Sequence, residues 1–299
     1  MAKKPTRRKK NNEAFSTGNE PESHAKGAVP VVDDRRRWFL IGVFVVIALG
    51  GTYLAQAMKG VSNVQRFTYK KDFKKYRHDK GAFTQGLVWD DDEKYVWEST
   101  GKYDGQSSIR KVELETGKVV EKKTLPDDEF GEGLTLVGDK LYQLTWKEGV
   151  CHVYDKNLDK VKDFEYPGQG WGLTYDGKHL VMSDGTSKLY FRDPETFEVE
   201  RVVTVRMGRA YINQLNELEY AGGFIYANRL DWDSVYKIDP SNGNVVAIIE
   251  LNGLWKNRPA EGVMNGIAVK SLSRKAGRVI VTGKYCPFIY EIEIVPKSN

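Results

Sequence analysis

Cysteine and histidine are scarce in this 299-residue chain, which has two Cys and four His. Two cysteines allow one bridge at most, which excludes a disulfide-stapled scaffold. We expect Cys151 and Cys286 to be buried free thiols, and a bridge in an oxidising lumen is the alternative. The histidines lack metal-ligand spacing, and P-loop, GxGxxG and GxSxG motifs are absent. We therefore expect no metal and no cofactor.

Excess positive charge is confined to the N-terminus. The chain has 46 Lys and Arg against 41 Asp and Glu, but residues 1–37 hold ten basic and five acidic residues. Residues 38–57 hold no charge, so the remainder is neutral, with 36 residues of each sign. A neutral globular part gives no electrostatic footprint for nucleic acid, and we expect no such partner. The tail of residues 1–37 is predicted to be disordered.

Long apolar runs are absent apart from residues 38–57, WFLIGVFVVIALGGTYLAQA. Twenty residues are about enough for a helix to cross the roughly 30 Å hydrocarbon core. The basic residues before the run favour a cytoplasmic N-terminus. We predict a cytoplasmic tail (1–37) and a transmembrane signal anchor (38–57), hence a single-pass type II membrane protein of the endoplasmic reticulum or Golgi. Its C-terminal part would be lumenal, or secreted if the A-x-A sequence ending the run is cleaved.

One unit recurs five times after residue 80, where short β-branched and aromatic runs alternate with turn signals. Each unit begins with a short head followed by three apolar strands, and the heads are spaced by 47, 39, 45 and 49 residues. The five heads are QGL (85–87), EGL (132–134), WGL (171–173), NEL (216–218) and NGI (265–267). Four strands in about 40–45 residues are typical of propeller blades. The sequence therefore predicts an all-β fold.

The chain ends indicate how the repeats close. The fifth unit stops after its third strand, and residues 64–76 offer a candidate for the missing fourth strand. Pairing the two ends in one blade would remove a sheet edge. We predict a five-bladed β-propeller closed by an N-terminal strand. Residues 58–75 would form a stalk and the closing strand, and residues 76–299 the propeller catalytic domain.

The first strand of each propeller blade lines the central channel, so the heads should converge there. They present Gln85, Glu132, Trp171, Asn216 and Asn265. The ends of the second strands should add three more side chains at the same mouth: Trp146, Asn228 and Lys284. Such a polar, aromatic-walled pocket with one acid is a plausible ligand site. Burial would raise the pKa of Glu132 and suit it to proton transfer, unless it only ties strands together.

A series of motifs runs in order through the five repeats: GAFTQGL, FGEGLT, LTWKEG, GWGLTYDGKHLVMSDGTSKLYFRDPETF, LNELEY, YAN, MNGIAV and VTGK. They resemble the plant and bacterial type of glutaminyl-peptide cyclotransferase from about Tyr76 to Ile294, leaving residues 1–60 outside. The resemblance implies a five-bladed propeller that acts on peptides or proteins with N-terminal glutamine. It implies conversion of that residue to pyroglutamate, with release of ammonia and without a metal.

The resemblance also implies site residues. Glu132, in FGEG, would be the catalytic acid and base. The substrate pocket would be formed by seven residues: Phe83, Gln85, Phe130, Trp146, Trp171, Asn216 and Lys284. The chain departs from the family pattern at Leu230 and Cys286, where the family has Trp, and at Gln169, where it often has Glu.

Two other functions remain open at this point. One is a non-catalytic, lumenal peptide-binding propeller, which the lost tryptophans at Leu230 and Cys286 favour. The other is a calcium-dependent propeller hydrolase or lactonase, which the lack of a metal-binding cluster at the heads disfavours. Release of ammonia from a peptide with N-terminal glutamine separates the first from a cyclotransferase, and sensitivity to chelators identifies the second.

Overall fold

The computed structural model describes residues 64–270 and 278–297. All of them belong to the second of two compact units, residues 52–299. The predicted tail and signal anchor lie outside the described residues, as does the first part of the predicted stalk. In the described part, every regular element is a β-strand, which confirms the all-β prediction. These residues include no helix with the length and hydropathy needed to span a membrane.

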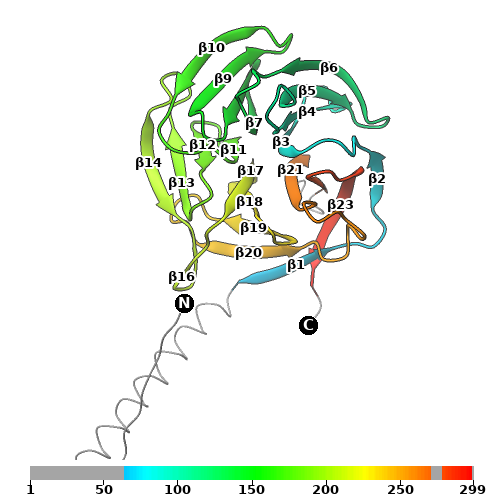
Figure 1. Ribbon diagram of the computed structural model, residues 1–299. Coiled ribbons are helices and arrows are strands. Elements are labelled where there is room, and N and C mark those ends of the chain that lie inside the picture. The colour runs from blue at the N-terminus through cyan, green and yellow to red at the C-terminus, as the bar shows by residue number, and fades with distance from the viewer. Residues whose placement is uncertain (1–63, 271–277, 298–299) are drawn as a thin grey trace, which may run out of the picture. The chain divides into compact units, whose positions relative to one another are not determined.

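The strands form antiparallel four-stranded sheets that follow one another along the chain (Figure 1). The first sheet contains β3 (Thr84–Trp89), β4 (Tyr95–Thr100), β5 (Ser108–Glu113) and β6 (Lys118–Thr124). The second contains β7 (Gly131–Val137), β8 (Lys140–Thr145), β9 (Val150–Asp155) and β10 (Lys160–Glu165). The third contains β11 (Leu173–Tyr175), β12 (Leu180–Ser183), β13 (Lys188–Arg192) and β14 (Val199–Thr204).

The last two repeats are joined into one larger sheet. The fourth repeat supplies β17 (Leu215–Ala221), β18 (Phe224–Arg229), β19 (Ser234–Ile238) and β20 (Val245–Glu250). The fifth supplies β21 (Met264–Lys270), β22 (Arg278–Gly283) and β23 (Phe288–Pro296). Between them lies β1 (Gln65–Tyr69), which pairs in parallel with β20 and antiparallel with β23. A small hairpin, β15 (Arg206–Met207) and β16 (Ala210–Tyr211), precedes the fourth repeat.

The two ends of the described part meet in the fifth repeat. The strand β2 (Lys74–Arg77) pairs antiparallel with β23, with Lys74 opposite Glu291 and Arg77 opposite Phe288. It therefore occupies the fourth position that the repeat itself leaves empty, and it lies at the end of the segment proposed for this role. The pairing satisfies backbone groups that an open edge would leave unpaired.

The first strands of the five repeats contact one another in a closed cycle. The strand β3 contacts β7, and the contacts continue through β11, β17 and β21 back to β3. Figure 1 shows the sheets arranged around this centre. The described part thus has a propeller-like fold in which the five heads face one another.

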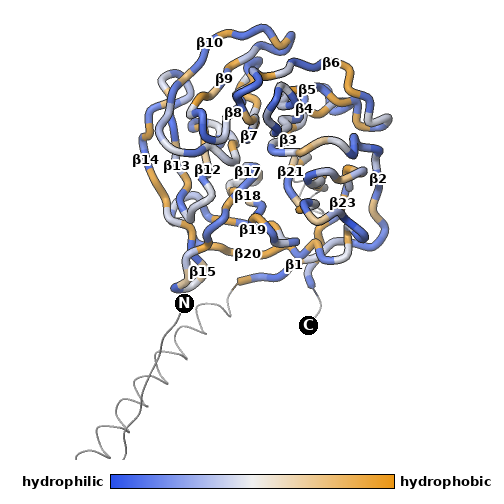
Figure 2. Tube along the Cα trace, viewed as in Figure 1, coloured by the Kyte–Doolittle hydropathy of each residue, from blue (hydrophilic) through white to orange (hydrophobic). Residues whose placement is uncertain are grey.

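Neighbouring sheets pack through apolar faces. Trp97 and Ile109 of the first sheet pack with Leu134 and Leu141 of the second. The burial of each large side chain stabilises the fold by about 1.5–3 kcal/mol. The outermost strands of the first three sheets, β6, β10 and β14, are largely exposed, and β10 is mostly hydrophilic (Figure 2). Along β10, Lys162 and Phe164 are half-buried while Val161, Asp163 and Glu165 are exposed, so one face of this strand is turned toward the core.

Irregular backbone marks the heads. The pairing of the first and second strands shifts register at Thr84/Gly86, at Gly131/Leu134, and at the corresponding places in the fourth and fifth repeats. Such bulges re-aim side chains and are frequent beside active sites. A Cβ on Gly86 would lie 2.5 Å from the backbone nitrogen of Leu134, so only glycine permits this approach of neighbouring first strands.

Candidate active site

A cavity of about 310 Å³ opens where the heads converge. Nine residues line it: Phe83, Gln85, Phe130, Glu132, Trp146, Trp171, Asn216, Leu230 and Lys284. Eight of these are the predicted catalytic and pocket residues, and the ninth is Leu230, one of the departures from the family pattern. Residues spread over two hundred positions of sequence are therefore brought into one site.

Each side chain reaches the cavity from the same end of its sheet. Gln85, Glu132 and Asn216 lie at the bulged starts of β3, β7 and β17, and Trp171 lies two residues before the start of β11. Lys284 directly follows β22. The remaining lining residues flank these strands: Phe83, Phe130, Trp146 and Leu230. The first-strand starts and second-strand ends thus form the mouth of the site.

Glu132 is the one acid among the nine described residues that line this cavity. Its side chain is almost fully buried, with 4% of the residue exposed. One carboxylate oxygen, Oε1, accepts a hydrogen bond of 2.7 Å from Nε2 of Gln85. The other oxygen, Oε2, has no hydrogen-bond partner among the described residues. Burial raises the pKa of Glu132 well above its usual range, with the charge of Lys284 opposing that shift.

Gln85 is held in place by Asn265 of the fifth head. Nδ2 of Asn265 donates to Oε1 of Gln85 at 3.1 Å and to the backbone oxygen of Thr84 at 3.0 Å. These bonds fix the orientation of the Gln85 amide, so that its nitrogen faces Glu132. Gln85 therefore positions the carboxylate.

Lys284 lines the same cavity as Glu132, and only 7% of its surface is exposed. Its Nζ lies 4.5 Å from the centre of the Phe83 ring, within cation–π range. Burial lowers the pKa of Lys284, and the negative charge of Glu132 opposes this. Asn216 completes the polar lining, and its Oδ1 is buried without a partner in the described part of the chain. The site thus offers a cation and an unpaired acceptor around one carboxylate.

Two indoles in the cavity lining share one anchor. Nε1 of Trp146 and Nε1 of Trp171 both donate to Oε1 of Gln169, at 2.9 and 3.1 Å. Phe130 packs edge-on against Trp146, with ring centroids 5.6 Å apart. The aromatic wall is therefore fixed both by ring contacts and by one shared acceptor.

The comparisons with known proteins agree with one another. The glutamine cyclotransferase family profile matches residues 43–294, most of the chain. This chain belongs to the glutamine cyclotransferase family. It is 41% identical, over 230 residues, to a glutaminyl-peptide cyclotransferase of Arabidopsis thaliana, covering 75% of this chain and 70% of the relative. The family match begins at residue 43, so residues 43–60 fall within it, although residues 1–60 were expected to lie outside.

A solved structure of the family has the same fold. The crystal structure of Myxococcus xanthus glutaminyl cyclase superimposes with a TM-score of 0.71 at 35% sequence identity. The alignment covers 79% of this chain and all of that one. The propeller-like arrangement is therefore shared with an experimentally determined glutaminyl cyclase.

Two expected site residues lie elsewhere in this cyclotransferase. Asn265 donates a hydrogen bond to Gln85 and does not line the cavity. Asn228 is buried, and its Oδ1 accepts a hydrogen bond of 2.9 Å from the backbone nitrogen of Gly266. Both side chains are used to connect adjacent repeats. Their positions in the repeats predict that both side chains lie at the same end of the ring as the cavity. Whether each one lines the cavity depends on contacts between repeats.

The departures from the family pattern also have defined surroundings. Leu230 gives the cavity one aliphatic wall, while nearby Trp232 is 49% exposed and stacks on Arg229, with the guanidinium carbon 4.5 Å from the ring centre. Trp232 does not replace the missing indole. Cys286 is buried, and both cysteines are free thiols, as expected.

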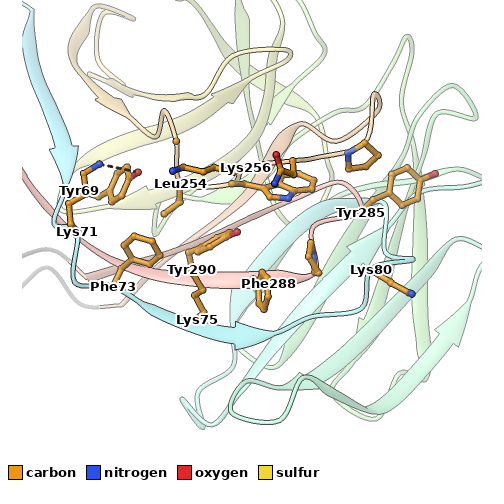
Figure 3. A pocket seen from close by; sticks show the side chains of 15 residues that line it. Tyr69, Lys71, Phe73, Lys75, Lys80, Leu254, Lys256, Tyr285, Phe288 and Tyr290 are labelled. Atoms are coloured by element: carbon orange, nitrogen blue, oxygen red, sulfur yellow. Dashed lines mark hydrogen bonds between the residues drawn. The ribbon is translucent and has the colours of Figure 1, made fainter.

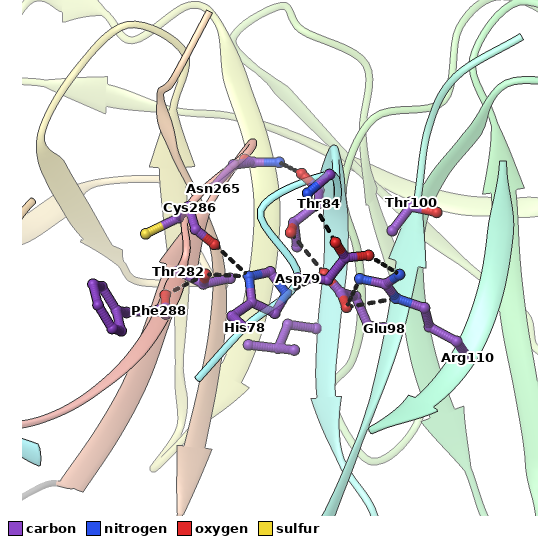
Figure 4. Close-up of polar contacts among 12 residues, drawn as sticks. His78, Asp79, Thr84, Glu98, Thr100, Arg110, Asn265, Thr282, Cys286 and Phe288 are labelled. Carbon is purple, nitrogen blue, oxygen red and sulfur yellow. Dashed lines mark hydrogen bonds and ion pairs between the residues drawn. The ribbon is translucent and has the colours of Figure 1, made fainter. Parts of the chain in front are cut away.

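A buried ionic network flanks the site at the junction of the first and fifth repeats (Figure 4). Nε2 of His78 bonds to Glu98 at 2.9 Å, and Nδ1 bonds to the Cys286 carbonyl at 2.7 Å. Both partners are acceptors, so this arrangement favours the cationic form of His78, in which both ring nitrogens carry protons. Although burial lowers its pKa, the charge of Glu98 and these bonds raise it overall. Arg110 binds the other Glu98 oxygen at 2.8 Å.

Within residues 64–270 and 278–297, no group of three or more His, Cys, Asp and Glu side chains is arranged to hold a metal ion. His152 and His179 instead pair with carboxylates, for example His152 with Asp163 at 2.7 Å. The acids and histidines described here therefore serve as hydrogen-bond and ion-pair partners.

Proposed function

We propose that this chain is a glutaminyl-peptide cyclotransferase, which converts the N-terminal glutamine of peptides and proteins to pyroglutamate and releases ammonia. The observation that carries the proposal is the environment of Glu132. One buried carboxylate, with one oxygen held by Gln85 and the other unpaired among the described residues, faces a cavity with aromatic walls. Membership of the glutamine cyclotransferase family supports the same activity.

The reaction is an intramolecular substitution. The neutral α-amine of the substrate attacks the carbon of its own side-chain amide, and a C–N bond forms that closes a five-membered ring. The bond to the amide nitrogen breaks, and that nitrogen leaves as ammonia. An α-amine in a short peptide has a pKa of about 7.7–8.0, so part of the substrate is neutral at working pH. The enzyme must hold the side chain folded back, and fixed orientation of this kind lowers the barrier substantially.

Glu132 acts as the proton shuttle in this proposal. Its unpaired Oε2 accepts a proton from the attacking amine and returns it to the leaving nitrogen, so the carboxylate is regenerated. A proton transfer of this kind contributes about 10²–10⁴ in rate. A raised pKa brings Glu132 closer to the pKa of the groups with which it exchanges the proton.

The other polar side chains of the cavity have separate roles in the proposed reaction. The Lys284 ammonium stabilises the negative charge that develops on the amide oxygen. The unpaired Oδ1 of Asn216 accepts an N–H from the substrate. The two ends of the Gln85 amide bind Glu132 and Asn265, which gives this side chain the task of positioning the carboxylate. The rings of Trp146 and Trp171 pack on the substrate methylenes and exclude water.

The direct test is ammonia release from a Gln-initiated peptide by the full-length chain and by Glu132→Gln. The variant should keep the fold and lose about 10²–10⁴ in kcat. Glu165→Gln, at an exposed position on β10, is the matched control and should match wild type. Near wild-type turnover by correctly folded Glu132→Gln protein would refute the shuttle. Peptide binding without any ammonia release by the wild type would instead favour the non-catalytic peptide-binding alternative.

We also infer the wider architecture. The cycle of five first strands and the pairing of β2 with β23 support a five-bladed propeller closed by an N-terminal strand, with residues 76–299 as its catalytic domain. We propose that residues 58–75 supply the stalk and closing strand and that residues 38–57 anchor the chain in a secretory-pathway membrane, with residues 1–37 in the cytoplasm. Protease protection of a C-terminal tag in intact microsomes, with digestion of an N-terminal tag, tests this topology.

A further inference from the structure

A second, larger hollow lies beside the fifth repeat (Figure 3). Its volume is about 780 Å³, and it is lined by residues of β1, β2 and β23 together with the segment around Trp255. Aromatic rings form much of its wall, among them Tyr69, Phe73, Phe288 and Tyr290. We refer to it as the lysine groove.

The charge of the lysine groove is entirely positive. Four lysines line it, Lys71, Lys75, Lys80 and Lys256, and no Asp or Glu is present among its fifteen described lining residues. Their side chains are exposed, and none of the four forms an ion pair with another described residue. Lys75 lies over the aromatic floor, with its Nζ 5.6 Å from the Phe288 ring centre. The chain after residue 57 is balanced in charge as a whole, so this concentration of cations makes a local anion-binding surface.

The lysine groove and the active-site cavity share a wall. Tyr285 lines the groove, and the preceding residue, Lys284, lines the cavity. The Tyr285 ring packs edge-on against Phe83, with centroids 5.2 Å apart. Its backbone has φ of 63°, a left-handed conformation that is rare for a bulky residue and clusters at functional sites. The Tyr285 amide is tied to the Ala82 carbonyl, which holds this partition in place.

We propose that the lysine groove binds the residues of the substrate that follow its N-terminal glutamine, and that it selects peptides with acidic side chains there. This inference rests on the proposed function. A peptide whose first residue occupies the cavity must continue out of the mouth, and Tyr285, which packs on Phe83 at the shared wall, lines the groove together with Lys80. Aspartate and glutamate then meet lysines that lack competing acids, while the aromatic floor packs on the peptide's apolar groups.

The test compares three substrates of the full-length chain in detergent: a glutaminyl dipeptide, a neutral Gln-initiated octapeptide, and the same octapeptide with Glu at positions four to seven. The variant is Lys75→Gln/Lys80→Gln/Lys256→Gln. The matched control removes three exposed lysines outside the groove, Lys118, Lys122 and Lys188. We expect the wild type to favour the acidic octapeptide, and the groove variant to raise KM for that substrate about tenfold.

Two further measurements test whether the change in KM is specific to acidic peptides. The kinetics of the dipeptide should stay unchanged in both variants, and the preference for acid should weaken as NaCl is raised, because salt screens exposed charges. Equal kcat/KM for the two octapeptides in the wild type would overturn the proposal while leaving the proposed function intact. Failure to cyclise any of the three substrates would overturn the proposed function itself.

A membrane surface is the competing source of negative charge. The full-length chain is reconstituted into vesicles of phosphatidylcholine with and without phosphatidylserine, and the octapeptides are assayed again. If the groove substitutions change activity only when phosphatidylserine is present, the lysines serve the lipid surface and the peptide proposal is wrong. If the preference for acidic peptides persists in phosphatidylcholine alone, the proposal is supported.

Discussion

Replacement of Gln169 tests whether the aromatic wall must be held to bind substrate. One carbonyl oxygen, Oε1 of Gln169, accepts both indole N–H groups, from Trp146 and Trp171. Gln169→Met keeps the length of the side chain and removes the acceptor. Gln169→Glu keeps an acceptor at the same place. The two variants thus separate loss of volume from loss of the hydrogen bonds.

The magnitude follows from the two bonds. A neutral hydrogen bond contributes about 0.5–1.5 kcal/mol net, so two contribute about 1–3 kcal/mol. Gln169 lies at the exposed rim, where water can replace part of the loss. The lower part of the range therefore applies, and about 1.4 kcal/mol corresponds to about tenfold. We expect KM of Gln169→Met to rise about tenfold with kcat nearly unchanged, because the carboxylate is untouched.

The assay is steady-state ammonia release from a Gln-initiated peptide, with thermal unfolding as the check on folding. Gln169→Glu should keep KM within about threefold of wild type, because carboxylate oxygens accept indole N–H groups at least as well. A KM for Gln169→Met equal to that of wild type would refute the reasoning. An equal loss in both variants would also refute it, since the acceptor would then not be the decisive property.

Three further outcomes follow from buried titratable groups. Because burial raises the pKa of Glu132, kcat/KM should fall as pH is lowered through that pKa, and the residual activity of Glu132→Gln should lack this dependence on the acid. His78 has a raised pKa in the fold, so its contribution to stability is complete below about pH 6.5 and is lost as pH rises through the folded pKa. Urea unfolding should show His78→Gln losing about 3 kcal/mol at pH 5.5 and less at pH 9. Glu217→Gln should lower the free energy of unfolding by about 1–3 kcal/mol, because an amide nitrogen would face a backbone N–H; an unchanged urea midpoint would contradict this.

The sequence predicted the repeats well because each blade is a local pattern. The second and third strands, such as β4 and β5, follow the alternation of apolar residues and the turn signals between them. The heads were located because they recur at nearly constant spacing. Equivalent positions in a ring converge on one axis, so Gln85, Glu132 and Asn216 were predicted together without any knowledge of their contacts.

Contacts between repeats could not be obtained in the same way. Asn265 and Asn228 carry the same signal as the lining residues, yet they bond to neighbouring strands. Gln169 was noted only as a departure from a family pattern, and its role requires the indoles of two different repeats to meet. The lysine groove joins residues from both ends of the described part. No spacing in the sequence records such pairings, which depend on how the ring closes.

Burial alone does not identify the reactive acid in this ring. Glu217 is 0% exposed and sits at the position where the other four heads have glycine, and burial raises its pKa as it does that of Glu132. Its two oxygens, however, accept the backbone N–H groups of Leu87 at 3.2 Å and Ile267 at 2.9 Å, so it connects the fourth repeat to the first and fifth. Glu132 lines the cavity, and its Oε2 is buried without a hydrogen-bond partner among the described residues. A carboxylate with both oxygens engaged stabilises the ring, whereas one with an unpaired oxygen can still accept a substrate proton, and this difference is the reason that we propose Glu132, and not Glu217, as the proton shuttle.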